Sequence, residues 1–244
     1  MSQTQSPVRL NFSTDWSYAP APESAGHAKI KDRYDLFING QFVAPTEGKY
    51  FATTNPANEK KIADVGLASA DDVDKAVKSA RKAYEKVWSK MPASERGKYV
   101  YRIARIIQDR ARELAVIESM DGGKAIRESR DVDVPLAAAH FFYYAGWADK
   151  LPYAFPGKAP QPLGVAGQII PWNFPLLMAA WKIAPALATG NTVVLKPAET
   201  TPLTALKLAE IIQDADLPPG VVNIVTGAGE TGAAIVNHPG LDKI

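Results

Sequence analysis

The sequence contains no cysteine among its 244 residues, and this absence excludes several kinds of chemistry. Disulfides, thiolate metal sites and a thiol nucleophile cannot come from this chain. Histidine is scarce as well. His27, His140 and His238 lie far apart, and none has the short spacing to another His or Glu that a helical zinc site uses. The sequence therefore predicts no metal site.

The chain also lacks a large net charge and long apolar runs. Its 28 basic and 26 acidic residues give a net charge of +2, so electrostatics give no reason to expect nucleic acid or an anionic membrane as a partner. No stretch approaches the roughly 20 apolar residues that span a bilayer. Residues 1–16 lack the basic and apolar regions of a secretory signal. These observations favour a cytoplasmic protein.

The first residues differ in composition from the rest. Residues 1–33 are rich in Ser, Pro and Ala without a sustained period, and we expect a flexible N-terminal extension there. Order is expected to begin in "YDLFINGQFV" (34–43). Two short apolar runs flank Asn39-Gly40 in this stretch, which predicts a β-hairpin.

Helical periodicity dominates the stretch that follows. Ser69 and Asp72 resemble a capping box with Asp in place of the usual Glu, so a helix is expected to begin there. Apolar residues at helical spacing continue in two further stretches, the first ending at the breaker Gly122-Gly123. The three predicted helices cover 69–88, 94–121 and 136–150.

From residue 163 onward, apolar strands alternate with helices. The predicted strands cover 163–170, 191–197 and 220–227, with another beginning at "LDKI", and the helices cover 175–190, 201–216 and 230–238. Near-continuous Val and Ile runs between helices are typical of a parallel sheet covered on both faces, so the predicted class is α/β, a doubly wound parallel sheet with flanking helices. In such sheets ligands bind beyond the carboxyl ends of the strands. Asn173 and Lys196 both lie at such ends.

Asn173 stands in the "IIPWNFP" segment, between two prolines and two aromatic residues. Pro171 and Pro175 restrict the backbone on both sides. A stiff turn that holds one amide donor suits an oxyanion hole, because catalysis needs a donor aimed at developing charge. The alternative is that Asn173 caps the helix that follows.

Two further motifs follow buried strands. In "LKPAE", the Lys196 ammonium and the Glu199 carboxylate could both bind the hydroxyls of a ribose. Alternatively, Glu199 interacts with a helix dipole and Lys196 is solvated. The glycine-rich "TGAGETG" (226–232), which contains Gly229, resembles a phosphate or adenine cradle. Its spacing is not G-x-G-x-x-G.

These motifs occur together in one order. "GVAGQIIPWNFPLLMAAWKIAPALATGNTVVLKPAETTPLTALKLAEII", followed by "LPPGVVNIVTGAGETGAAIVNHPGLDKI", closely resembles the NAD(P)-dependent aldehyde dehydrogenase superfamily, and the resemblance extends upstream to about residue 34. It implies a Rossmann-like cofactor-binding domain, here 34–143 and 163–244, and oxidation of an aldehyde to a carboxylic acid. It also implies that Asn173 stabilises the oxyanion of the thiohemiacetal.

The resemblance also implies a cofactor site. Lys196 and Glu199 match the pair that holds the adenosine ribose, and Gly229 matches a glycine beside the adenine. The strand end that lines the cofactor cleft is matched by Ile169, Ile170, Pro171 and Trp172. Because a carboxylate would repel the 2′-phosphate of NADP, Glu199 favours NAD.

The chain departs from the family pattern in two respects. The family's nucleophilic cysteine, general-base glutamate and pyrophosphate-contacting turn lie downstream of "GLDKI", so the chain resembles the N-terminal part of such an enzyme. Alternatively, it is a non-catalytic nucleotide-binding fragment, or part of a pseudoenzyme, that acts in assembly. Residues 144–162 are a shortened, proline-rich version of the segment by which many members form tetramers, which favours a homodimer for the intact protein.

Overall fold

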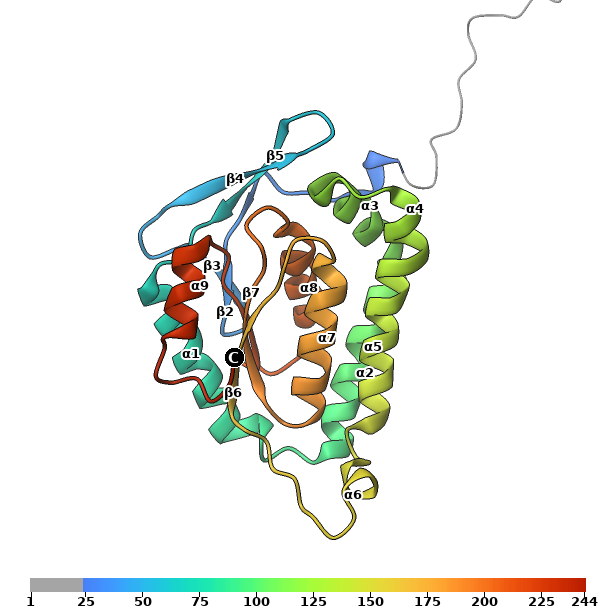
Figure 1. Cartoon of the computed structure of the whole chain (residues 1–244), viewed down its shortest axis with the longest axis vertical. Helices are drawn as coiled ribbons and strands as arrows, with labels where there is room; N and C mark the ends of the chain where they lie inside the picture. The colour runs from blue at the N-terminus through green and yellow to red at the C-terminus, as the bar shows by residue number, and fades with distance from the viewer. Residues whose placement is uncertain (1–23) are drawn as a thin grey trace, which may run out of the picture.

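The computed structural model describes residues 24–244, and a five-stranded sheet forms its centre (Figure 1). The strand order is β3-β2-β8-β7-β6. β6, β7 and β8 run parallel, while β2 pairs antiparallel with both β3 and β8. The strands span Leu36–Ile38 (β2), Gln41–Val43 (β3), Val165–Ile169 (β6), Thr192–Lys196 (β7) and Val222–Ile224 (β8).

Helices cover both faces of this sheet, as β7 illustrates. Its Val193 and Leu195 are buried in one core cluster, with α7 (Pro175–Ala188) and α8 (Leu203–Asp214). Val194, between them, is buried in a second cluster with α1 (Ala70–Ala83) and α9 (Gly229–Val236). Side chains alternate across a strand, so β7 is buried at every position and apolar at Val193, Val194 and Leu195, because both of its faces are covered. The predicted Rossmann-like α/β class is confirmed.

Further elements surround this core. On the α7–α8 side pack α2 (Ala93–Asp109), α3 (Ala111–Gly122) and α5 (Val134–Trp147) (Figure 1). A smaller sheet has the order β1-β5-β4. The remaining elements are a 3₁₀ turn (Ala25–His27), β1 (Arg33–Tyr34), β4 (Tyr50–Asn55), β5 (Lys60–Gly66), π-helical turns at Tyr84–Trp88 and Ser129–Asp133, α4 (Ile126–Glu128) and α6 (Leu151–Ala154). No helix within residues 24–244 is both long and apolar enough to cross a membrane.

Two local predictions are confirmed. Asn39 and Gly40 both have positive φ angles, 54° and 77°, in the turn between β2 and β3, as a two-residue hairpin requires. At the start of α1, the Ser69 hydroxyl accepts from the Asp72 N–H while the Asp72 carboxylate accepts from the Ser69 N–H. This is the reciprocal capping box expected from the sequence.

The predicted helix over 94–121 is wrong as a single helix. The backbone leaves helical geometry at Arg110, where φ is −98° and ψ is 14°, and two helices result. The Arg110 guanidinium donates to Glu113 and to Glu210 of α8. The apolar periodicity continues across the break, so it could not reveal this tertiary contact between two helices.

The predicted N-terminal extension falls largely outside the described residues, which begin at position 24. Within 24–33, Ala28 and Ile30 pack against the cluster around Tyr34, and the Lys31 ammonium lies 2.9 Å from a Glu210 carboxylate oxygen. The end of the predicted extension is therefore attached to α8.

Candidate functional site

The carboxyl ends of β6 and β7 lie side by side. Ile169 and Lys196 are opposite each other in the parallel pair, and the Ile170 N–H donates to the Lys196 carbonyl at 3.1 Å. A methyl group on Gly232 of α9 would lie 3.6 Å from Lys196 Cε and 3.8 Å from Ile169 Cδ1. The two strand ends and the first turns of α9 therefore pack against one another.

The Lys196 ammonium is enclosed rather than solvated. The residue is 4% exposed, and its Nζ donates to the Pro197 carbonyl at 2.8 Å and lies 3.4 Å from Glu199 Oε2. Burial lowers the pKa of Lys196, and the Glu199 carboxylate opposes that shift. The alternative of a solvated lysine is wrong.

The Glu199 carboxylate faces outward. Its side chain is 50% exposed, and its own backbone N–H, followed by Lys196, lowers its pKa, so it is ionised at neutral pH. It lies outside the first turn of α8, which begins at Leu203, so the helix-dipole alternative is wrong too. An ionised carboxylate beside a fixed ammonium can accept hydrogen bonds from two neighbouring hydroxyls of a ligand.

Two glycines shape the start of α9. A Cβ at Gly227 would lie 2.1 Å from Thr231 Oγ1, so a larger residue does not fit there. A Cβ at Gly229 would meet nothing within 4 Å, and this residue is exposed at the first position of the helix. A flat group could therefore approach the backbone at Gly229 without steric hindrance.

The segment from 170 to 175 connects β6 to α7. Trp172 is 62% exposed, and Pro171 and Asn173 are exposed too, whereas Ile170 is 3% exposed and packs in the core. Of the four predicted cleft residues, three therefore reach the surface, namely Ile169, Pro171 and Trp172. The side chain of Ile170 is buried, so only its backbone could line the cleft. The Thr201 hydroxyl donates to the Trp172 carbonyl at 3.4 Å, which links this turn to the loop after β7.

Asn173 does not cap α7. That helix begins at Pro175, its N-cap is Phe174, and no side chain supplies a cap hydrogen bond. Among the residues that the structure describes, the Asn173 side chain has no hydrogen-bond partner at all. The capping alternative is wrong, and the amide is free to donate to a ligand.

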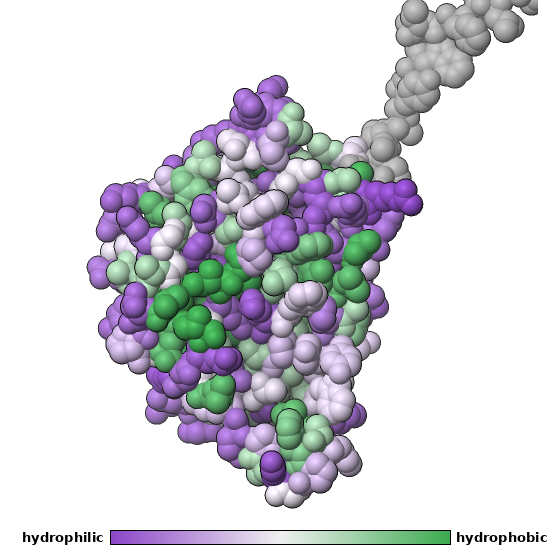
Figure 2. Space-filling view, viewed as in Figure 1, coloured by the Kyte–Doolittle hydropathy of each residue, from purple (hydrophilic) through white to green (hydrophobic). Residues whose placement is uncertain are grey.

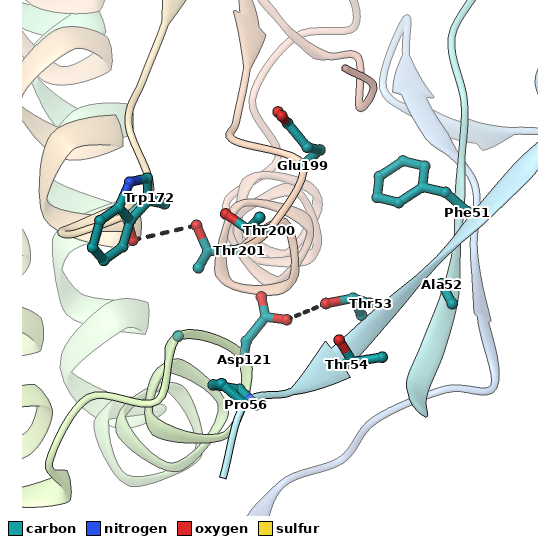
Figure 3. A pocket seen from close by; sticks show the side chains of 11 residues that line it. Phe51, Ala52, Thr53, Thr54, Pro56, Asp121, Trp172, Glu199, Thr200 and Thr201 are labelled. Carbon is teal, nitrogen blue, oxygen red and sulfur yellow. Dashed lines mark hydrogen bonds between the residues drawn. The ribbon is translucent and has the colours of Figure 1, made fainter. Parts of the chain in front are cut away.

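Trp172 and Glu199 line the same cavity, which has a volume of about 510 Å³ (Figure 3). Asp121 lies opposite Glu199 in this cavity; its carboxylate accepts from the Thr53 hydroxyl at 2.6 Å and from the Leu203 N–H at 2.9 Å. Burial raises the pKa of Asp121 to about 6. Sequence reasoning missed these lining residues, although Asp121 directly precedes the recognised Gly122-Gly123 break.

The comparisons with known proteins give a consistent result. The model of the aldehyde dehydrogenase family matches residues 42–244. An aldehyde dehydrogenase from Alternaria alternata is 48% identical over 218 residues, which cover 86% of this chain and 44% of that protein. Human retinal dehydrogenase 2 is 47% identical over 220 residues, covering 86% of this chain and 42% of that protein.

The solved structures agree. The NAD⁺ complex of an aldehyde dehydrogenase from Bacillus cereus has a TM-score of 0.83 and 45% identity, covering 86% of this chain and 45% of that one. This chain thus spans less than half the length of each of these three relatives. Since the family model covers most of its residues, the chain belongs to the aldehyde dehydrogenase family.

Proposed function

We propose that the protein carrying this chain oxidises an aldehyde to a carboxylic acid with NAD, and that the chain supplies the adenosine-ribose site and the oxyanion donor. The observation that carries the proposal is the Lys196–Glu199 pair, whose ammonium is buried and whose carboxylate is half exposed. The unpartnered amide of Asn173 lies at the end of the adjacent strand.

The residues at these strand ends fit NAD. Glu199 would accept hydrogen bonds from the two ribose hydroxyls, and Lys196 would donate to the same sugar. The open side of Gly229 leaves room for adenine, and Ile169, Pro171 and Trp172 would line the cleft. NAD, when bound, supplies the hydride acceptor. The ionised Glu199 would repel a 2′-phosphate, so we propose NAD rather than NADP.

Asn173 would act on the aldehyde oxygen. When a nucleophile adds to the carbonyl carbon, negative charge develops on this oxygen, and an amide N–H already aimed at it stabilises that charge without reorganisation. The nucleophile in this scheme is a thiol supplied from outside these residues, because the chain has no cysteine. The proposal therefore assigns to this chain only one part of the catalytic machinery.

Formation of NADH with a panel of aldehydes tests the proposal. The whole protein that carries this chain should reduce NAD with at least one aldehyde. The 244-residue chain alone should give no turnover even at high concentration, since it cannot form the covalent adduct. Turnover by the isolated chain would contradict the need for an external thiol.

The absence of cysteine also supports a second candidate, a nucleotide-binding part that acts in assembly without chemistry. NAD binding without aldehyde-dependent NADH formation in the whole protein would favour it. We further propose that the intact protein is a homodimer. Residues 155–164 contain no strand, and sedimentation would separate a dimer from a tetramer.

A cytoplasmic location completes the proposal. Its basis is the composition of residues 1–16. Two relatives, from Antirrhinum majus and Arabidopsis thaliana, are named as mitochondrial, so cell fractionation is the appropriate test.

A further inference from the structure

A buried polar cluster lies near the Asn173 turn and contacts Phe174. It consists of Glu118 near the end of α3, Lys124 in the following loop and Asp133 at the end of the second π-helical turn. Glu118 and Asp133 are each 1% exposed, and the Lys124 side chain is 15% exposed. Burial of charged groups is costly unless they are paired, so this cluster calls for an explanation.

Lys124 connects the cluster to the turn. Its ammonium forms an ion pair with the Asp133 carboxylate. The same Nζ lies 3.8 Å from the centre of the Phe174 ring, within the range of a cation–π contact. Phe174 is the residue directly after Asn173. The α3–α4 connection thus reaches the end of the molecule at which α7 begins (Figure 1).

Glu118 is buried beside Asp133 and Lys124. Neither of its carboxyl oxygens accepts a hydrogen bond from any donor in the described part of the chain. Burial, followed by the neighbouring Asp133 carboxylate, raises the pKa of Glu118 to about 8, although the Lys124 ammonium acts in the opposite direction. A Glu118 carboxyl that keeps its proton adds no second negative charge beside Asp133.

We propose that Glu118, Lys124 and Asp133 form a brace that positions Phe174 and thereby holds the Asn173 amide in its catalytic direction. The inference rests on the proposed role of Asn173. The Asn173 side chain has no partner of its own, but its turn is held on both sides. Lys124 contacts Phe174 on one side, and Thr201 bonds to the Trp172 carbonyl on the other. The three members of the brace are positioning residues.

Lys124→Met tests the brace, since it keeps the chain length and removes the charge. Because this change leaves Asp133 buried without its partner, the double variant Lys124→Met/Asp133→Asn is made alongside it. Lys124→Arg keeps the cation and should rescue. Lys90→Met is the matched control, because Lys90 is exposed in the turn before α2.

Two readouts are needed. The order parameter of the Asn173 side-chain amide, measured by NMR relaxation in the 244-residue chain, requires no activity. It should fall to below about 0.6 in the double variant and stay near the parent value in the Arg and control variants. In the whole protein, kcat should fall by on the order of 10-fold or more, since small misplacements of a catalytic group are costly. The KM for NAD should not change.

The outcomes separate this inference from the proposed function. An unchanged amide order parameter in both the Lys124→Met chain and the double variant overturns the brace. Equal losses of order in Lys124→Arg overturn it too, because the cation would then be irrelevant. If Asn173→Ala leaves kcat unchanged, the proposed role of Asn173 fails, whatever the order parameter shows.

Discussion

Two lysine–carboxylate pairs lie near the segment 170–175, and they are built in opposite ways. In the Lys196–Glu199 pair the lysine side chain is 5% exposed and the carboxylate 50%. In the Lys124–Asp133 pair the carboxylate is 1% exposed, and the ammonium contacts an aromatic ring. A carboxylate that faces outward can bind a ligand. An enclosed carboxylate can only orient its protein neighbours, so exposure separates a binding pair from a positioning pair.

Asn173 lies in this segment, and its removal should have the largest effect. In the whole protein, Asn173→Ala should lower kcat by about 10²–10³, the usual cost of one oxyanion donor. NAD affinity and melting temperature should change little, because the amide contacts neither the ribose site nor the start of α7. Steady-state kinetics and a melting curve check this. Normal turnover in the variant would remove Asn173 from the chemistry.

Glu118→Gln tests the buried cluster through the pH dependence of the free energy of unfolding. The folded-state pKa of Glu118, about 8, lies above its ordinary value of 4.5. Between these values the unfolded chain releases the proton and the folded chain keeps it. The free energy of unfolding should therefore fall as pH rises from about 4.5 to about 8, by up to a few kcal/mol.

In the Glu118→Gln variant, the free energy of unfolding should not show this decline with pH. Urea unfolding at pH 5 and pH 8 measures the decline for parent and variant. Parallel declines in the two proteins would show that Glu118 is ionised in the folded state, contrary to the brace.

Another buried carboxyl, Asp72, has a pKa shift opposite to that of Glu118. Burial alone would raise the pKa of Asp72, but hydrogen bonds from the hydroxyl and backbone N–H groups of Thr46 and Ser69 outweigh it and lower the pKa. Ser69→Ala should cost about 1 kcal/mol of unfolding free energy, the usual loss for an N-cap. Ser94→Ala in α2 is the control, because the exposed Ser94 hydroxyl has no hydrogen-bond partner among the described residues. Equal losses in the two variants would contradict the capping role.

The local parts of the fold could be predicted because their causes are local. Asn39-Gly40 specified its hairpin, Ser69 and Asp72 specified their cap, and apolar runs such as 192–196 indicated strands buried on both faces. The break at Arg110 could not be predicted, because its partner Glu210 comes from a distant helix.

The candidate site, like the fold, could be predicted only in part. Lys196 and Glu199 were recognised because they follow a strand, but the sequence could not decide which of the two would be buried. The brace was not foreseen at all. Glu118, Lys124 and Asp133 have no distinctive spacing, and only tertiary packing brings them together and places Lys124 against Phe174.

The difference between the two lysine–carboxylate pairs is tested most directly by NAD affinity. It is measured by calorimetry in the whole protein for one variant of each pair, Glu199→Gln and Asp133→Asn. Glu199→Gln should weaken NAD binding about 10- to 100-fold, because charge-assisted hydrogen bonds to the ribose are lost, and should narrow the preference for NAD over NADP. Asp133→Asn, if folded, should leave NAD affinity unchanged. An unchanged affinity in Glu199→Gln, or equal losses in the two variants, would contradict the division into a binding pair and a positioning pair.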